Sequence, residues 1–172
     1  MSGNGAVTAS MAALQSDIAA KVQASGTSFY SAMRLLPQAR RDAMFAIYAF
    51  CREVDDIADE PAEIADKKRR LEGWRGEIAK LYDGSPQHPF AAALLPCVKQ
   101  FKLRREDFLA VIDGMEMDAV EDIVAPPMDT LDLYCDRVAS AVGRLSVRAS
   151  GATEPQADDV AYHLGRALQL TN

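Results

Sequence analysis

Apolar residues recur every three to four positions along most of the chain, the spacing that places them on one face of an α-helix. The clearest example covers residues 37–59, where Pro37 suits the first turn of a helix and Pro61 ends it. A second example covers residues 62–82 and has Lys and Arg opposite its apolar stripe. The residues of that stripe are Ile64, Leu71, Trp74, Ile78 and Leu81. Both segments are predicted to be helices.

The remainder of the chain repeats this pattern between short breaks. Turn and loop residues gather at "YDGSPQHP" and "VAPPMD", and no alternating run of β-branched residues indicates a strand. Further helices are predicted at residues 89–100, 104–121, 130–149 and 155–172. The fold class is therefore predicted to be all-α.

The domain organisation follows from the same pattern. The first ten residues are rich in Gly and Ser, so residues 1–24 are predicted to be disordered or to form a short lead helix over residues 11–23. Residues 25–172 are predicted to belong to a single domain. The helical pattern still continues at "GRALQLTN", where the chain stops without a C-cap glycine. We therefore expect an N-terminal portion of a larger domain.

Composition narrows the class of protein. The formal net charge of −6, without a basic stripe, argues against nucleic acid as a partner. The three cysteines are far apart and odd in number, which suits a reducing compartment rather than a disulfide framework. The N-terminus lacks the basic start of a signal peptide, and no apolar run reaches the about 18 residues of a membrane span. A cytoplasmic protein is expected, with contact at a membrane surface and the oligomeric state left open.

The helix predicted over residues 37–59 carries a narrow polar line that ends in the acidic run "DDIADE". At about 100° per residue, Asp55 and Asp59 fall within about 60° of Tyr48 and Arg52. One interpretation is a solvated face on which Arg52 pairs with the neighbouring acids. The other is an inward-facing site in which the carboxylates hold a metal ion.

Two observations favour the inward-facing interpretation. Met44 and Phe45 lie on the same line as Tyr48, which is unusual for a face in contact with water only. The acids also lie at a helix C-terminus, where the helix dipole disfavours negative charge and a divalent cation would offset it. Carboxylates four residues apart, such as Asp55 and Asp59, can each give one oxygen to Mg²⁺, while water and a substrate phosphate complete its coordination.

Several segments together resemble the squalene/phytoene synthase family. They are "SGTSFYSAMRLLPQARRDAMFAIYAFCREVDDIAD" (25–59), "GMEMD" (114–118), "YCDRVASAVGRLS" (134–146) and "LGRALQLTN" (164–172). The resemblance implies an all-α prenyl synthase bundle with a central cavity, in which two prenyl diphosphates are joined head to head with the help of Mg²⁺. It also implies that the C-terminal helices of that fold are missing from this chain, which would then be inactive by itself.

The resemblance assigns roles to individual residues. Asp55 and Asp59 match the first aspartate-rich motif, which binds a diphosphate through Mg²⁺, and Tyr48 and Arg52 match substrate contacts one and two turns before it. Tyr134 matches a catalytic tyrosine beside the cyclopropyl intermediate, although taken alone it is better explained as a core aromatic residue.

Two further segments match substrate or metal positions of the family. One is predicted to close over a diphosphate, an ordinary loop and N-cap being the alternative; its residues are Ser25, Thr27, Ser28 and Phe29. Gln169 and Asn172 match the first half of a second metal motif, with Gln169 near the substrate and Asn172 as a Mg²⁺ ligand. Ser140 and Arg137 depart from the family pattern, which has a glycine and often an aromatic residue at these positions.

Within the family, "CREVDDIADEP", "IDGMEMDAVEDI" and "YCDRVASAVGRLSVR" most resemble the bacterial presqualene diphosphate synthases of hopanoid biosynthesis. The implied reaction joins two molecules of farnesyl diphosphate and closes a cyclopropane ring. Two alternatives stay open: a phytoene synthase that uses geranylgeranyl diphosphate, and a non-catalytic helical module that binds prenyl lipids.

Overall fold

The computed structural model describes residues 3–120, 125–152 and 154–171, and in the first helix the side chains from residue 13 onward. Every element in these ranges is helical, which confirms the predicted all-α class. The elements are α1 (Gly3–Ala24), α2 (Phe29–Arg34), α3 (Gln38–Asp59), α4 (Ile64–Asp83), α5 (Pro89–Phe101), α6 (Arg105–Val120), α7 (Met128–Cys135), the π-helix η1 (Asp136–Ser140), α8 (Ala141–Ala149) and α9 (Pro155–Thr171). None of them is long and apolar enough to cross a membrane.

Most boundaries agree with the sequence pattern, and the differences have local causes. The lead helix, predicted over residues 11–23, begins at Gly3. A further short helix, α2, forms within the segment expected to close over a diphosphate. The helix predicted over residues 130–149 is continuous in path but contains the π-helical turn η1. Apolar periodicity does not report such a turn, because one extra residue shifts the pattern without interrupting it.

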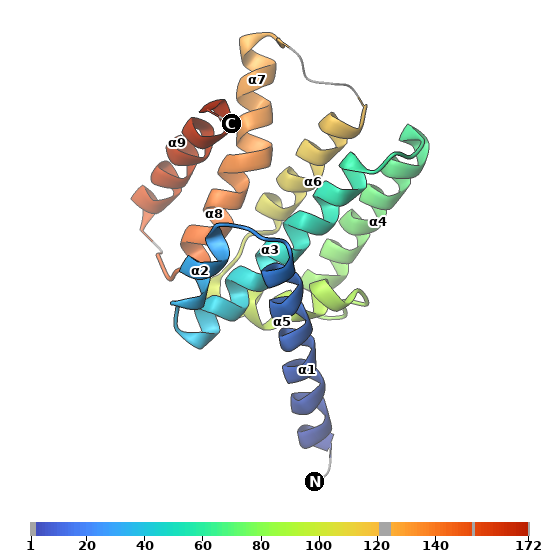
Figure 1. Cartoon of the computed structure of the whole chain (residues 1–172), viewed down its shortest axis with the longest axis vertical. Coiled ribbons are helices and arrows are strands. Elements are labelled where there is room, and N and C mark those ends of the chain that lie inside the picture. Colours follow the sequence, from blue (N-terminus) through green and yellow to red (C-terminus); the bar gives the residue numbers. More distant parts are fainter. Residues whose placement is uncertain (1–2, 121–124, 153, 172) are drawn as a thin grey trace.

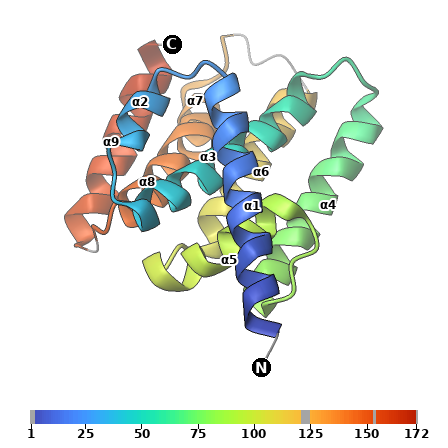
Figure 2. The same cartoon turned by 60° about the horizontal axis from the view of Figure 1, so that its bottom comes forward.

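The long helix α3 lies at the centre of the bundle, with α1 and α5 on one side and α6 and α8 on the other (Figures 1 and 2). Its apolar face is buried, and Phe45, which the pattern places on the line of Tyr48, is buried as well. The buried residues are Ala43, Phe45, Ala46, Ile47, Ala49, Phe50, Val54, Ile57 and Ala58. Phe50 is fully buried and meets Trp74 of α4 and Phe108 of α6 edge-on, with ring centroids 5.4 and 5.2 Å apart. This aromatic contact fixes α3 between its neighbours.

Helix α6 runs antiparallel to the continuous path α7–η1–α8. At one end of the pair, Asp107 of α6 accepts a hydrogen bond from Arg144 of α8 at 2.6 Å, and at the other end Asp118 meets Tyr134 of α7. Helix α9 then packs along η1 and α8 at the outer edge of the bundle (Figure 1). The ends of α3 and α6 and the start of α7 therefore share one end of the molecule.

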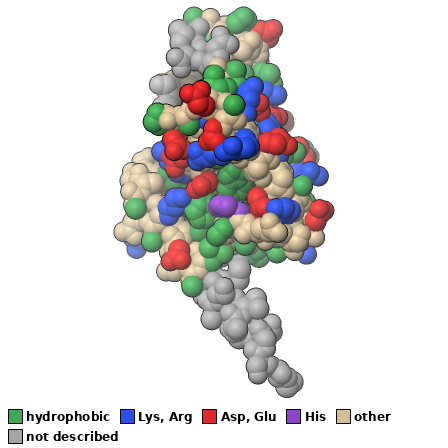
Figure 3. Space-filling model, turned by 90° about the vertical axis from the view of Figure 1, so that its right-hand side faces the viewer, with side chains coloured by type: hydrophobic (Ala, Val, Ile, Leu, Met, Phe, Trp, Pro, Cys, Tyr) green, Lys and Arg blue, Asp and Glu red, His purple; other side chains and the backbone are tan. Residues whose placement is uncertain are grey.

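Charged residues pair across the helices on the face that α4 covers. Figure 3 shows a band of Lys and Arg bordered by Asp and Glu on this side of the molecule. Arg75 of α4 donates to Asp113 and Glu116 of α6, both at 2.6 Å. These ion pairs lie between helices, and they hold α4 against α6.

Candidate functional site

Acidic and phenolic side chains from separate helices converge at the end of the bundle where α3 and α6 finish. The Tyr134 hydroxyl of α7 donates a hydrogen bond to the Asp118 carboxylate of α6 at 3.0 Å. Asp55 and Asp59, in the last two turns of α3, lie close enough for their charges to act on this pair. The three helices thereby place two predicted metal ligands beside the predicted catalytic tyrosine.

At this end of the bundle, negative charge exceeds the positive charge close to it. Burial raises the pKa of Asp55, and the charge of Asp59 raises it further, against the lowering effect of Arg52. Burial also raises the pKa of Asp118, against the hydrogen bond from Tyr134, and the charge of Asp59 adds to the increase. Each carboxylate is thus harder to ionise than a free aspartate, because the cations nearby do not balance the acids.

Tyr134 is held as a neutral phenol. Burial raises its pKa above the ordinary value, and the charge of Asp118, the hydrogen bond to Asp118 and the charge of Asp55 act in the same direction. Its proton points to the Asp118 carboxylate, so the oxygen keeps its lone pairs for another partner.

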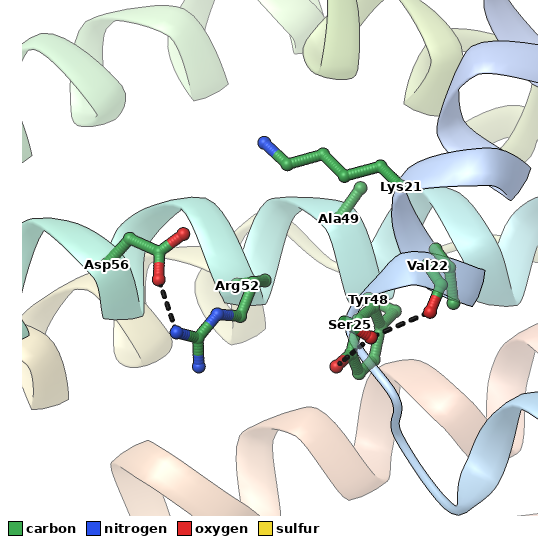
Figure 4. Close-up of a pocket in the computed structure, with 7 residues that line it drawn as sticks. All are labelled: Lys21, Val22, Ser25, Tyr48, Ala49, Arg52 and Asp56. Atoms are coloured by element: carbon green, nitrogen blue, oxygen red, sulfur yellow. Dashed lines mark hydrogen bonds and ion pairs between the residues drawn. The ribbon is translucent and has the colours of Figure 1, made fainter.

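A small pocket of about 170 Å³ lies between α1 and α3 (Figure 4). Its lining residues are Lys21, Val22, Ser25, Tyr48, Ala49, Arg52 and Asp56. The pocket therefore brings together three residues predicted to bind substrate, namely Ser25, Tyr48 and Arg52. It also contains Lys21, which sequence reasoning did not assign to the site because it precedes the segment that resembles the family.

Hydrogen bonds fix the polar groups of this pocket. The Ser25 hydroxyl donates to the carbonyl of Val22 at 2.7 Å, and it lies 3.0 Å from the Tyr48 hydroxyl. Because Ser25 has one proton, Tyr48 is the donor in the second contact. Arg52 forms ion pairs with Asp55 at 2.8 Å and Asp56 at 2.5 Å. The pairing expected for a solvated face is thus present, and Asp55 at the same time lies close to the Asp118 carboxylate.

The acidic end of α3 is partly neutralised by α4, which the sequence reading did not foresee. Lys67 donates to the carbonyl of Ala58 at 2.5 Å, and Arg70 pairs with Glu60. These cations offset the unfavourable charge at the C-terminus of α3. A bound metal is therefore not required to explain why the helix tolerates its acids, and the case for one rests on Asp55 and its neighbours alone.

Within the described ranges, no three His, Cys, Asp or Glu side chains are gathered closely enough to hold a metal ion by themselves. The carboxylates of Asp55, Asp59 and Asp118 nevertheless fit a divalent cation, because burial and the charge of Asp59 raise the pKa of Asp55 and of Asp118, and a cation would relieve that repulsion. Such an ion would take its other ligands from water and from a substrate phosphate.

The other predicted site residues that the structure describes lie on the segment before α2, on α2 and on α9. Thr27 accepts a hydrogen bond from the backbone N–H of Phe29 at 3.4 Å, and Phe29 is 64% exposed at the start of α2. Ser28 occupies the N-cap of α2 without a side-chain capping bond. Gln169 is half-buried on α9, and Asn172 lies outside the described residues. The roles of these five residues stay predictions.

Asp118, like Lys21, is a residue that sequence reasoning did not assign to the site. It ends the segment "GMEMD", which the resemblance included without giving any of its residues a role. The signal that identifies it is the antiparallel pairing of this segment with "YCDRV", which places Asp118 opposite Tyr134. That pairing cannot be read from periodicity, because it depends on how two helices are aligned.

Comparisons with known proteins show which family the chain belongs to. The squalene/phytoene synthase family model matches residues 22–172, so the chain belongs to the squalene/phytoene synthase family. It is 56% identical to the presqualene diphosphate synthase of Rhodopseudomonas palustris over 147 residues, which are 86% of this chain and 52% of that protein. The phytoene synthase of Arthrospira platensis is 33% identical, over 84% of this chain and 51% of that protein.

Solved structures give the same result. A crystal structure of a dehydrosqualene synthase in complex with ligand superposes with a TM-score of 0.81 at 28% identity, and the match covers 95% of this chain and 56% of that chain. The squalene synthase HpnC from Alicyclobacillus acidocaldarius superposes with a TM-score of 0.79 at 26% identity, over 90% of this chain and 58% of that chain. The chain thus spans about half the length of the curated relatives it matches.

Proposed function

We propose that this chain forms the part of a presqualene diphosphate synthase that holds one farnesyl diphosphate through Mg²⁺ for head-to-head condensation with a second farnesyl diphosphate. The observation that carries the proposal is the convergence of Asp55 with Asp118 and Tyr134 from different helices. The 56% identity to proteins called presqualene diphosphate synthase supports the choice of reaction within the family.

The α3 carboxylates have the first role in this proposal. Asp55 and Asp59 would hold the cation, and Mg²⁺ when bound would take up the negative charge that develops on a departing diphosphate. Arg52 is placed one turn before Asp55 and already donates to that carboxylate at 2.8 Å. Its guanidinium can exchange a carboxylate oxygen for a phosphate oxygen, since both suit its paired N–H groups.

The pocket beside α1 has the second role. Tyr48 donates to Ser25, and the remaining lone pairs and N–H groups of the lining residues can bind water or phosphate oxygens. Lys21 adds positive charge to the wall, although it also pairs with Glu53 at 3.0 Å. A diphosphate at the edge of this pocket would meet two cationic side chains, Lys21 and Arg52.

Tyr134 has the third role, at the carbon centres. In the proposed reaction, the C1–O bond of one farnesyl diphosphate breaks and its electron pair leaves with the diphosphate. The electron pair of the 2,3-alkene of the second molecule then bonds to C1, and loss of a proton closes the cyclopropane. A neutral phenol whose proton is directed to Asp118 offers its oxygen lone pairs to a neighbouring cationic carbon.

Two other functions are compatible with the family. A phytoene synthase would use geranylgeranyl diphosphate, and the 33% identity to such an enzyme makes it the second candidate. A non-catalytic module would bind prenyl lipids without needing Asp55. The proposed location is the cytoplasm, with contact at a membrane surface left open.

Mg²⁺-dependent binding of farnesyl diphosphate to this chain, measured by calorimetry, tests the proposal. Asp55→Asn should lower the affinity at least about tenfold, the loss of one charge-assisted interaction with the cation. Glu106→Gln is the matched control, because Glu106 is exposed at the far end of α6 and should leave binding unchanged. Equal binding with and without Mg²⁺ would favour the lipid-binding module, and tighter binding of geranylgeranyl diphosphate would favour the phytoene synthase.

A further inference from the structure

The contact between α6 and the path α7–η1–α8 has a regular antiparallel register. Residues four apart on α6 face residues four apart on the other side: Gly114 faces Val138, and Asp118 faces Tyr134. The close approach at Gly114 is therefore one helical turn from the hydrogen bond between Asp118 and Tyr134. The distance between the two helices at Gly114 therefore also determines the distance between Asp118 and Tyr134.

Gly114 leaves no room for a side chain. A Cβ at this position would lie 2.7 Å from Cγ1 of Val138, 3.0 Å from Cβ of Arg137 and 3.3 Å from the Arg137 carbonyl carbon. Val138 is β-branched and stiff in a helix, so its methyl group cannot simply turn away. A methyl group added at Gly114 must push the two helices apart.

The turn that Gly114 touches is the π-helix η1. The backbone N–H of Ala141 donates to the carbonyl of Asp136, five residues earlier, so this turn holds one residue more than an α-helical turn. An extra residue rotates everything before it by about 100° relative to everything after it. Tyr134 lies just before the turn, and the Arg144 that anchors α8 lies just after it.

Helix α9 fixes the other side of the same turn. The fully buried Ser140 donates its hydroxyl proton to the carbonyl of Tyr162 at 2.9 Å. A Cβ on Gly165 would lie 2.7 Å from the backbone nitrogen of Ser140, so the two backbones are in direct contact. The π-turn is thus clamped between Gly114 on α6 and Gly165 on α9.

We infer that Gly114 and the π-helical turn Asp136–Ser140 are positioning elements, which set the spacing and the rotation at which Tyr134 meets Asp118. Gly114 sets the distance between the helices, and the extra residue turns the phenol toward α6. The contacts with Gly114 on one side and Gly165 on the other hold this less favourable helical turn in place. This inference rests on the proposed function for its meaning in catalysis, but not for its test.

The test asks, in the full chain, whether Tyr134 loses its partner when the helices move apart. It compares the effect of Tyr134→Phe on the unfolding equilibrium in urea between two backgrounds, as a double-mutant cycle. In the parent, Tyr134→Phe removes a hydrogen bond to a carboxylate and should shift the unfolding equilibrium constant at least about tenfold. In Gly114→Ala the same change should have an effect below about threefold, because the hydrogen bond is already weakened. Gly76→Ala is the control background, since a Cβ there meets nothing within 4 Å, and it should leave the effect of Tyr134→Phe unchanged.

A pair of variants at Val138 makes the test decisive even if Gly114→Ala does not fold. Val138→Ala opens a gap opposite Gly114 and should reduce the effect of Tyr134→Phe, and adding Gly114→Ala to it should restore that effect by refilling the gap. A purely structural role would lower stability and leave the effect of Tyr134→Phe the same in every background. An unchanged effect of Tyr134→Phe in folded Gly114→Ala, or in Val138→Ala, would overturn the inference.

The affinity of the parent chain for farnesyl diphosphate with Mg²⁺ separates this inference from the proposed function. Absence of binding in the parent would contradict the proposed function and leave the double-mutant cycle standing. Binding in the parent together with a smaller effect of Tyr134→Phe in Gly114→Ala supports both.

Discussion

The carboxylates of this protein fall into two regions with opposite electrostatics. Asp107, near the start of α6, is 1% exposed and pairs with two cations, Arg144 at 2.6 Å and Arg104 at 3.0 Å, each of which also pairs with one further aspartate. Asp55, at the end of α3, has a side chain that is 40% exposed, and it shares Arg52 with a second acid. The buried acid is fully paired, and the half-buried acid is not.

This difference in pairing indicates a structural role for Asp107 and a functional role for Asp55. A buried charge that is paired and hydrogen-bonded holds helices together, as Asp107 does between α6 and α8. Acids that are half-buried and have too few cationic partners lower the stability of the fold. They therefore fit a site that binds a cation. The four predictions below test this division, from the largest expected effect to the smallest.

The largest effect is expected at Asp107. Asp107→Asn removes the charge but keeps the shape, and it leaves Arg144 and Arg104 facing a neutral amide in a buried position. We expect the free energy of unfolding in urea to fall by about 3–5 kcal/mol, the usual cost of breaking a buried ion pair. Glu106→Gln, on the adjacent exposed residue, should change it by less than about 0.5 kcal/mol.

The outcome for Asp107 bears directly on the comparison. A loss below about 1 kcal/mol would place Asp107 among surface ion pairs, whose contributions are of that size. Asp107 would then no longer be an example of a structural acid, and the division of the acids into a structural and a functional set would lose its main support.

The second prediction concerns Glu77, another paired acid. Although burial opposes its charge most strongly, the hydrogen bonds from Lys80 and from the backbone N–H groups of His88 and Gln87 lower its pKa to about 2. Its stabilising contribution is therefore present above the ordinary pKa of 4.5 and lost as the pH falls toward 2. Glu77→Gln should lower the free energy of unfolding at neutral pH by about 1.5–3 kcal/mol.

The pH dependence provides the check for Glu77. The difference in unfolding free energy between parent and Glu77→Gln should shrink between pH 4.5 and pH 2, measured by urea titration at each pH. A difference that stays constant over this range would mean that the carboxylate is not preferentially ionised in the folded state.

The sequence predicts the helices better than it predicts the site. Amphipathic spacing is a local property, so the buried face of α3 and the boundaries of α4 and α5 follow from it within a few residues. The π-turn η1 does not follow, because its extra residue is held by contacts with other helices, at Gly114 and Gly165. Such contacts depend on how helices align in space.

The candidate site shows the same limit. The line of Tyr48, Arg52, Asp55 and Asp59 is readable on one helix, and the structure places it beside a pocket and a second carboxylate. Asp118 was not readable, because it joins the site through the pairing of α6 with α7. The hydrogen bond from Lys67 of α4, which offsets the negative charge at the C-terminus of α3, was also not predicted, because it too depends on how two helices pack.

The third prediction tests the unpaired region. The raised pKa of Asp55 means that its stability penalty is absent below the ordinary value of 3.8 and fully present above the folded-state pKa. Asp55→Asn removes that penalty at neutral pH together with the ion pair to Arg52. We expect a change of less than about 1 kcal/mol in the free energy of unfolding, because the side chain is 40% exposed and water screens its charge. A loss as large as that of Asp107→Asn would show that Asp55 is structural.

The smallest expected effect is stabilisation by Mg²⁺ alone. A cation that binds only the folded chain raises its free energy of unfolding by about 0.4 kcal/mol at half saturation, and by more as its concentration rises. The melting temperature should therefore increase with Mg²⁺ concentration in the parent and in Glu106→Gln, but not in Asp55→Asn, which lacks the carboxylate charge. The comparison uses MgCl₂ against NaCl at equal ionic strength, because screening of the repelling acids would otherwise imitate binding. Equal responses in the parent and Asp55→Asn would place the cation elsewhere, and the unpaired acids of α3 would have to be explained without a metal ion.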